Sequence, residues 1–296
     1  MKIGTAEGNS TFESQGFALK SVLDTAGLAN VTILNSVSAS IENAKRLDAG
    51  ELDFGFMAAN WLGLARTGQA PFSTPIDLRM VAPMNAGPMY FIARADSDIH
   101  TVLDLRGKRV AIGLQTSGVA QHARSIFTAL GISHADFTPI YLDFADGAEA
   151  LARGDVDAQL QCPIPNNVMT ALDERIALRV LPYPQGALQT VLDARTIYRP
   201  TTMRAGSLRA LTQDIEQAAV VNVLVTHARV PAALVEFVTH AIYAGRNELP
   251  KLNKLFLGMG ELFEPLRTQG ASALQFDGVG LHDGAISAYR KAGLLA

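Results

Sequence analysis

An internal repeat is the sequence feature that most constrains the fold of this chain. A loop of small residues at 3–11 leads into a helical run at 12–26, and a similar loop at 112–118 leads into a second run at 119–130. A Gly-acid-x-Asp segment before an apolar stretch also occurs twice, and both repeats have an offset of about 105–110 residues. Its copies are Gly50-Glu51-Leu52-Asp53 and Gly154-Asp155-Val156-Asp157. Two copies of one strand–loop–helix design predict two similar α/β lobes with a cleft between them.

The order of the expected elements predicts a discontinuous first lobe. Strands alternate with helices along the sequence, which is typical of parallel α/β sheets. We expect the chain to cross between the lobes near 92–96 and near 196–206, where the second segment is extended and stiffened by proline. Lobe 1 then comprises 1–94 and 205–296, and lobe 2 comprises 95–204.

Composition limits the class of partner. The chain has 296 residues, of which 48 % are hydrophobic, so it holds enough apolar material for two cores. The formal net charge is -3 and the basic residues are scattered, so a nucleic-acid partner is not expected. The single cysteine, Cys162, excludes an internal disulfide and a cysteine-based metal site. No apolar run approaches the roughly 20 residues of a membrane span. Met1-Lys2 stands directly before the first strand, which leaves no room for a signal peptide; we expect a cytosolic protein or a mature domain with an added Met.

The two small-residue loops are candidates for binding an anion. The unpaired N–H groups and the positive dipole end of a helix N-terminus suit an anion, and hydroxyl groups add donors without charge. Two such termini at one cleft would hold a carboxylate from both sides, although ordinary helix capping also explains each loop. The first loop lacks the third glycine of a dinucleotide fingerprint. The loop residues are Gly4, Gly8, Asn9, Ser10 and Thr11 in the first copy, and Gly113, Thr116, Ser117 and Gly118 in the second.

Polar and aromatic residues also follow other expected strands, where the carboxyl ends of strands open to a cleft. A serine-rich segment before the second helix offers hydroxyl and amide contacts, or a simple cap. The only tryptophan and a tyrosine are candidate ligand walls, or core residues. The loop at 161–167 is the counterpart in the second lobe. These candidates are Ser38, Ser40 and Asn43, then Asn60, Trp61 and Tyr90, and finally Cys162, Pro163 and Asn166.

The sequence offers no catalytic constellation. A nucleophilic Cys162 needs a histidine base, and none of the six histidines has a suggestive spacing to it. The histidines are also too dispersed for a metal site, and no Gly-x-Ser-x-Gly elbow is present. The pattern therefore favours binding over catalysis, with no metal and no cofactor.

Several of these residues carry a resemblance to a known family. The chain is similar to the TAXI-family solute receptors of tripartite ATP-independent periplasmic (TRAP) transporters over nearly its whole length. The matching motifs are the loop that opens with Ile3-Gly4-Thr5, the helix start Ser40-Ile41-Glu42-Asn43, the segment 47–56, the stretch 104–118 with Asp104-Leu105-Arg106-Gly107-Lys108, and the crossover Tyr198-Arg199-Pro200-Thr201-Thr202-Met203-Arg204-Ala205-Gly206. The last motif is the most specific.

The resemblance implies a type II periplasmic binding-protein fold, an α/β fold of two similar lobes with a ligand cleft. It implies a periplasmic, monomeric receptor, its leader removed, that closes by hinge motion on a small organic anion, an amino acid or a carboxylic acid. A TRAP permease would be its membrane partner. The ligand contacts carried over are Thr5, Glu7, Asn9, Ser10, Ser38, Ser40, Asn43, Asn60, Trp61, Gln115, Thr116, Ser117, Gly118, Cys162, Pro163 and Asn166; Tyr90 joins them as an apolar wall.

Departures from the family pattern leave alternatives open. Ala6-Glu7 replaces glycines of the first loop, and Glu7 in a cleft would repel an anion or pair with an amine. The alternatives are the binding protein of an ATP-driven (ABC) importer, a cytosolic metabolite-sensing domain, and an enzyme similar to the thiamine-precursor synthases on the same fold.

Overall fold

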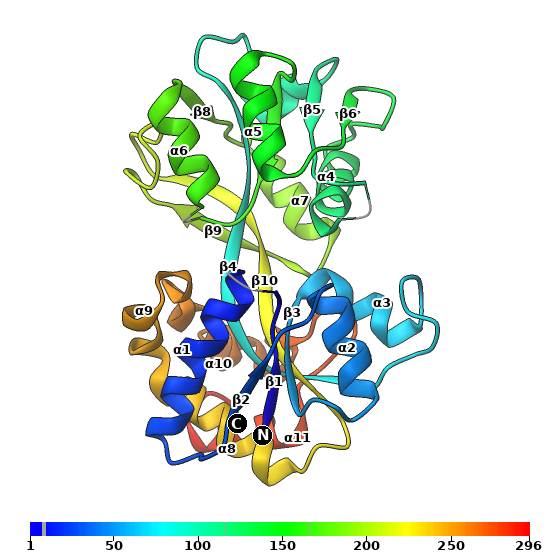
Figure 1. The fold of residues 1–296 in the computed structure, drawn as a ribbon, viewed down its shortest axis with the longest axis vertical. Helices are drawn as coiled ribbons and strands as arrows, with labels where there is room; N and C mark the ends of the chain where they lie inside the picture. Colours follow the sequence, from blue (N-terminus) through cyan, green and yellow to red (C-terminus); the bar gives the residue numbers. More distant parts are fainter. Residues whose placement is uncertain (8–9, 116, 165) are drawn as a thin grey trace. The chain divides into compact units, whose positions relative to one another are not determined.

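The chain forms two compact units that share two long strands (Figure 1). The computed structural model describes residues 1–7, 10–115, 117–164 and 166–296. Unit 1 comprises Met1–Ala86 and Val221–Ala296, and unit 2 comprises Gly87–Val220. The long strands are β4 (Leu78–Arg94) and β10 (Ile215–His227), and both unit boundaries fall inside them.

Unit 1 is built on a sheet with the strand order β2-β1-β3-β10. The first three strands, β1 (Lys2–Gly4), β2 (Thr32–Leu34) and β3 (Phe54–Ala58), are mutually parallel, and β10 runs antiparallel to β3. Ile3, Phe54 and Phe56 are completely buried. A strand that helices cover on both faces becomes apolar along its whole length, and β3 has this pattern.

The helices of unit 1 come from both ends of the chain. The longest are α1 (Thr11–Thr25), α2 (Ser40–Asp48), α8 (Ala232–Ala244) and α11 (Asp283–Lys291). The short ones are α3 (Leu62–Thr67), α9 (Leu249–Leu252), α10 (Leu266–Gln269), and the 3-10 turns η1 (Ala59–Trp61), η3 (Gly245–Asn247), η4 (Lys254–Phe256), η5 (Met259–Phe263) and η6 (Gly270–Leu274).

Unit 2 repeats the plan of unit 1. Its strand order is β4-β7-β5-β6, in which β5 (Arg109–Ala111) lies between β6 (Thr138–Ile140) and β7 (Ala158–Gln161), all three parallel, and β4 runs antiparallel to β7. Two further strands extend it, since β8 (Leu178–Val180) pairs with β4 and β9 (Tyr198–Met203) pairs with β10. Its helices are η2 (Val102–Leu105), α4 (Gly118–Ala129), α5 (Phe144–Arg153), α6 (Asn167–Arg175) and α7 (Ala187–Ala194).

The strand pairings make the internal repeat explicit. β1 in unit 1 and β5 in unit 2 are both central, each has two parallel neighbours, and each is followed by a Ser-capped helix. The predicted helices at 12–26 and 119–130 correspond to α1 and α4, each shifted by one residue.

The structure differs from the expected layout mainly along the shared strands. β4 is a single strand of 17 residues. The unit boundaries lie at Ala86/Gly87 and Val220/Val221, whereas the crossovers were expected near 92–96 and 196–206. The reason is that β4 and β10 continue as ladder strands past those boundaries, so the chain changes unit inside a strand rather than in a loop.

Candidate functional site

The carboxyl edge of each unit, where its parallel strands end, carries most of the predicted binding residues. Ligands of open α/β sheets bind beyond the carboxyl ends of the strands. In unit 1, Ala58 at the end of β3 is the pairing partner of Asn222 in β10. In unit 2, Gln161 at the end of β7 is the pairing partner of Tyr90 in β4. Each carboxyl edge therefore lies beside the part of a shared strand that passes into the other unit. This strand is β10 for unit 1 and β4 for unit 2.

The loop after β1 is tied into the sheet by Thr5. This residue is fully buried, and its hydroxyl lies 3.1 Å from Asn35 Oδ1 and 3.3 Å from the Leu34 carbonyl oxygen. Ser10 is the N-cap of α1 and accepts a hydrogen bond from the Glu13 N–H at 3.2 Å. The Ser10 hydroxyl keeps its own hydrogen to donate. Glu7 is exposed, and the predicted contact Asn9 lies outside the described residues.

Asn43 is used as a structural residue inside unit 1, and its contact with a ligand stays a prediction. It is fully buried, and its Nδ2 donates to the carbonyl oxygens of Thr5 at 2.8 Å and Phe56 at 2.9 Å. Its Oδ1 accepts from the Ser36 hydroxyl at 2.7 Å. Both amide hydrogens are thus used inside the chain. Ser40 has a similar local role, because its hydroxyl accepts from the Ala58 N–H at 3.1 Å.

The remaining predicted residues of unit 1 differ in exposure. Ser38 is exposed, and its backbone N–H donates to Glu42 Oε2 at 3.3 Å. Asn60 and Trp61 form η1 directly after β3 and are 4 % and 8 % exposed. Trp61 is therefore close to fully packed in unit 1, and its contact with a ligand stays a prediction.

The first loop of unit 2 matches the first loop of unit 1. Ser117 is the N-cap of α4 and accepts from the Ala120 N–H at 3.2 Å, and Gly118 is the first helical residue. Gly113 has φ +85°, a left-handed conformation that only glycine adopts without strain. Gln115 is exposed, and Thr116 lies outside the described residues.

The loop after β7 is held by the cis peptide bond between Cys162 and Pro163 and by the side chain of Asn166. Asn166 Oδ1 caps α6 by accepting from the N–H groups of Val168 and Met169, and its Nδ2 donates to Gln161 Oε1 at 2.9 Å. Burial raises the pKa of the Cys162 thiol to about 12, so the sulfur is a neutral thiol near pH 7. A neutral thiol is a poor nucleophile.

Tyr90 belongs to the core of unit 2, and its role as a ligand wall stays a prediction. Its side chain is fully buried among apolar residues that include Met169, Leu172 and Met203. Burial raises the pKa of the Tyr90 hydroxyl far above its usual range, and the neighbouring Cys162 adds to the effect.

Sequence reasoning missed a buried amide cluster at the edge of unit 1. Two hydrogen bonds join Gln15, Asn85 and Asn222. Gln15 and Asn85 are 70 residues apart in the sequence, and Asn85 and Asn222 are 137 residues apart. A polar residue inside an apolar strand was the only available signal, and both Asn85 and Asn222 have that position.

Charged residues at the expected crossovers are engaged on the surface. Arg94 pairs with Asp96 at 2.8 Å, and Arg204 pairs with Asp214 at 2.7 Å. Exposed pairs of this kind contribute little to stability.

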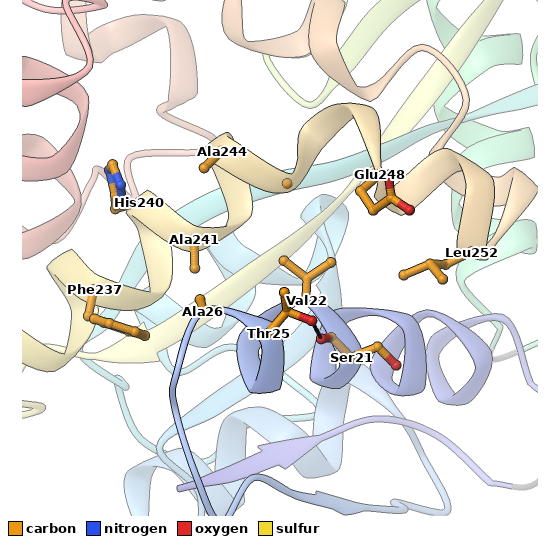
Figure 2. A pocket seen from close by; sticks show the side chains of 11 residues that line it. Ser21, Val22, Thr25, Ala26, Phe237, His240, Ala241, Ala244, Glu248 and Leu252 are labelled. Atoms are coloured by element: carbon orange, nitrogen blue, oxygen red, sulfur yellow. Dashed lines mark hydrogen bonds between the residues drawn. The ribbon is translucent and has the colours of Figure 1, made fainter.

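Unit 1 also has an apolar groove that involves none of the predicted residues (Figure 2). It has a volume of about 540 Å³ and lies between α1, α8 and α9. Figure 2 shows Ala26 of the α1 side opposite Ala241 of α8, with Phe237 and Leu252 toward the two ends of the groove.

No group of three or more His, Cys, Asp or Glu side chains among the described residues is arranged to hold a metal ion. None of the described helices combines the length and the apolar character that crossing a bilayer requires.

Comparison with known proteins places the chain in a family. A model of the NMT1-like family matches residues 3–293. The chain belongs to the NMT1-like family. Solved structures with the same fold include a putative sulfonate ABC-transporter periplasmic binding protein, SsuA, of Methylobacillus flagellatus KT, with 14 % identity over 100 % of this chain and 87 % of that one and a TM-score of 0.60.

Two further solved structures support the same fold for this NMT1-like protein. The probable amino-acid ABC-transporter extracellular-binding protein ytmK of Bacillus subtilis has 14 % identity over 88 % of this chain and 97 % of that one, with a TM-score of 0.52. XAC2383 of Xanthomonas citri, solved with ATP bound, has 13 % identity over 88 % and 89 %, with a TM-score of 0.56. At such identities the likeness shows the fold alone. The predicted α/β periplasmic binding-protein fold is confirmed.

Proposed function

We propose that this NMT1-like protein is an extracytoplasmic solute-binding protein that captures a small organic anion, such as an amino acid or a carboxylic acid. The observation that carries the proposal is the duplicated edge. Ser10 and Ser117 cap the helices that follow the central strands of the two units, and each hydroxyl keeps a hydrogen to donate. Each helix start also presents N–H groups and a positive dipole end.

The candidate ligand contacts in this proposal lie at the carboxyl edge of each unit. Unit 1 contributes the loop after β1 and the residues Asn60 and Trp61, and unit 2 contributes Ser117 with the loop that contains Cys162. The binding free energy then depends on how well these neutral donors replace water around the anion.

An ABC importer is the better supported membrane partner. The matched proteins from Methylobacillus flagellatus and Bacillus subtilis are both named as binding proteins of ABC transporters. Delivery to a TRAP permease, which the TAXI resemblance implies, is the second candidate and rests on the motif at 198–206. Uptake of labelled solute by vesicles that hold either transporter separates the two, since ATP drives only the ABC importer.

Native mass spectrometry of the freshly purified protein, followed by a thermal-shift panel, tests the binding function. The panel holds amino acids, mono- and dicarboxylic acids and alkanesulfonates. A ligand at 100 times its Kd stabilises the folded protein by about 2.7 kcal/mol, which raises Tm by several degrees. A co-purified small acid or such a shift supports the proposal. No bound mass and no shift from any compound would refute it.

A further inference from the structure

Three amide side chains form a buried cluster at the carboxyl edge of unit 1. Gln15 of α1, Asn85 of β4 and Asn222 of β10 are 0 %, 2 % and 8 % exposed. Gln15 Nε2 donates to Asn85 Oδ1 at 3.0 Å, and Asn222 Nδ2 donates to the same oxygen at 3.2 Å. Because Asn222 pairs with Ala58 at the end of β3, the cluster lies at the level where the parallel strands stop.

The cluster leaves one acceptor unused. Gln15 Oε1 is buried, and no residue that the structure describes donates a hydrogen bond to it. Such an oxygen costs about 1–3 kcal/mol when it has no donor, and buried polar groups are nearly always paired. With Asn85 oriented to accept both hydrogen bonds, turning the Gln15 amide by half a turn would bring its oxygen against Asn85 Oδ1, so in this network Oε1 is the atom without a donor.

The charges around the amide cluster also suit a ligand group with N–H hydrogens. Glu13 lies two residues before Gln15 on α1 and accepts from Asn35 Nδ2 at 2.7 Å. Glu7 is exposed in the loop before the same helix. Arg46 reaches the edge, but it donates to the Asn35 carbonyl oxygen at 3.1 Å and lies 3.3 Å from Glu51. A ligand group with N–H hydrogens fits these acceptors better than a carboxylate does.

We propose that Gln15 Oε1, positioned by Asn85 and Asn222, accepts a hydrogen bond from an N–H group of the solute. The solute then carries an ammonium or carboxamide group toward unit 1, in addition to its acidic group. This subsite rests on the proposed solute-binding function.

Matched compound pairs test the subsite in the wild-type protein. Three pairs differ only in the amino group: L-glutamate with glutarate, L-aspartate with succinate, and L-alanine with propionate. In a fourth pair, succinamate has a carboxamide where succinate has a second carboxylate. The dissociation constants of each pair are measured by isothermal titration calorimetry. We expect the N–H-bearing member of the binding pair to have at least about a tenfold lower Kd, which corresponds to about 1.4 kcal/mol.

The variant Gln15→Met removes the acceptor at similar side-chain volume. We expect it to reduce the tenfold preference to less than about threefold. Gln217→Met is the matched control, because Gln217 is also fully buried and its Oε1 also lacks a hydrogen-bond partner among the described residues. Gln217 lies in unit 2, outside the amide cluster, and donates to the Leu181 carbonyl oxygen at 3.1 Å. The control should keep the wild-type preference.

The outcomes separate the subsite from the function on which it rests. Equal or tighter binding of the compounds without N–H groups overturns the subsite and leaves solute binding intact. An unchanged preference in a folded Gln15→Met protein also overturns it. If none of the compounds binds, the proposed function and the subsite are both refuted. The wild-type comparison needs no variant, so it can overturn the subsite even if Gln15→Met does not fold.

Discussion

Replacing Asn43 by alanine should destabilise unit 1 strongly. The Asn43 side chain joins three separate segments, because it bonds to Thr5 after β1, to Phe56 in β3 and to Ser36 after β2. It also fills the space above Gly4 and Gly55, where an added methyl group would meet it. The substitution therefore removes the amide that holds the ends of three parallel strands together.

The magnitude follows from the groups that lose their partner. Two buried carbonyl oxygens and one hydroxyl lose a hydrogen bond, and each costs about 1–3 kcal/mol when it stays buried without one. The Ser36 hydroxyl retains its contact with Arg46 at 3.0 Å, and water can enter the space that Asn43 leaves. We therefore expect the free energy of unfolding to fall by about 3–5 kcal/mol, a large part of the 5–15 kcal/mol typical of a domain.

Urea unfolding followed by circular dichroism measures this loss from the midpoint and the slope m. Asn247→Ala is the control, since Asn247 is exposed in η3 of the same unit, and its effect should stay within about 0.5 kcal/mol. A loss below about 1 kcal/mol for Asn43→Ala refutes the reasoning. So does a variant that keeps its stability but loses affinity for the solute, because that result makes Asn43 a ligand contact.

Three other predictions concern protonation and capping. Burial, with a contribution from Arg195, lowers the pKa of His122 to about 3, and its Nδ1 lies 3.1 Å from the Tyr198 hydroxyl. Below about pH 6.5 the unfolded chain therefore binds a proton at His122 that the folded chain does not bind. The free energy of unfolding should fall as the pH falls from 6.5 toward 3. A His122 imidazole that titrates near pH 6 by NMR contradicts this prediction. Cys162, whose pKa is about 12, should react with iodoacetamide far more slowly at pH 7.5 than a free thiol, and equal rates refute that environment. The double variant Ser10→Ala/Ser117→Ala loses two helix caps, which should lower the free energy of unfolding by about 2 kcal/mol. Its affinity for the tightest-binding compound of the panel should fall at least about tenfold. An unchanged affinity would show that neither hydroxyl contacts the ligand.

The sequence alone determined the duplicated architecture of this protein. The two small-residue loops were recognisable as helix starts, and Ser10 and Ser117 are the N-caps of the helices α1 and α4 that follow them. The reason is that helix starts, turns and apolar periodicity depend on residues within a few positions of one another. The same local signals located both loops that follow the central strands, and the fold has them in equivalent places in the two units.

Only the tertiary structure decided which polar residues are used internally. Asn43 has the same local signal as a ligand contact, and its bonds to Thr5 and Phe56 exist because β1 and β3 become neighbours. Tyr90 was ambiguous between wall and core until the packing of unit 2 buried it. The polar positions of Asn85 and Asn222 in apolar strands do not reveal the amide cluster that they form with Gln15, because a hydrogen bond between residues far apart in the chain depends on the strand order and register that bring them together.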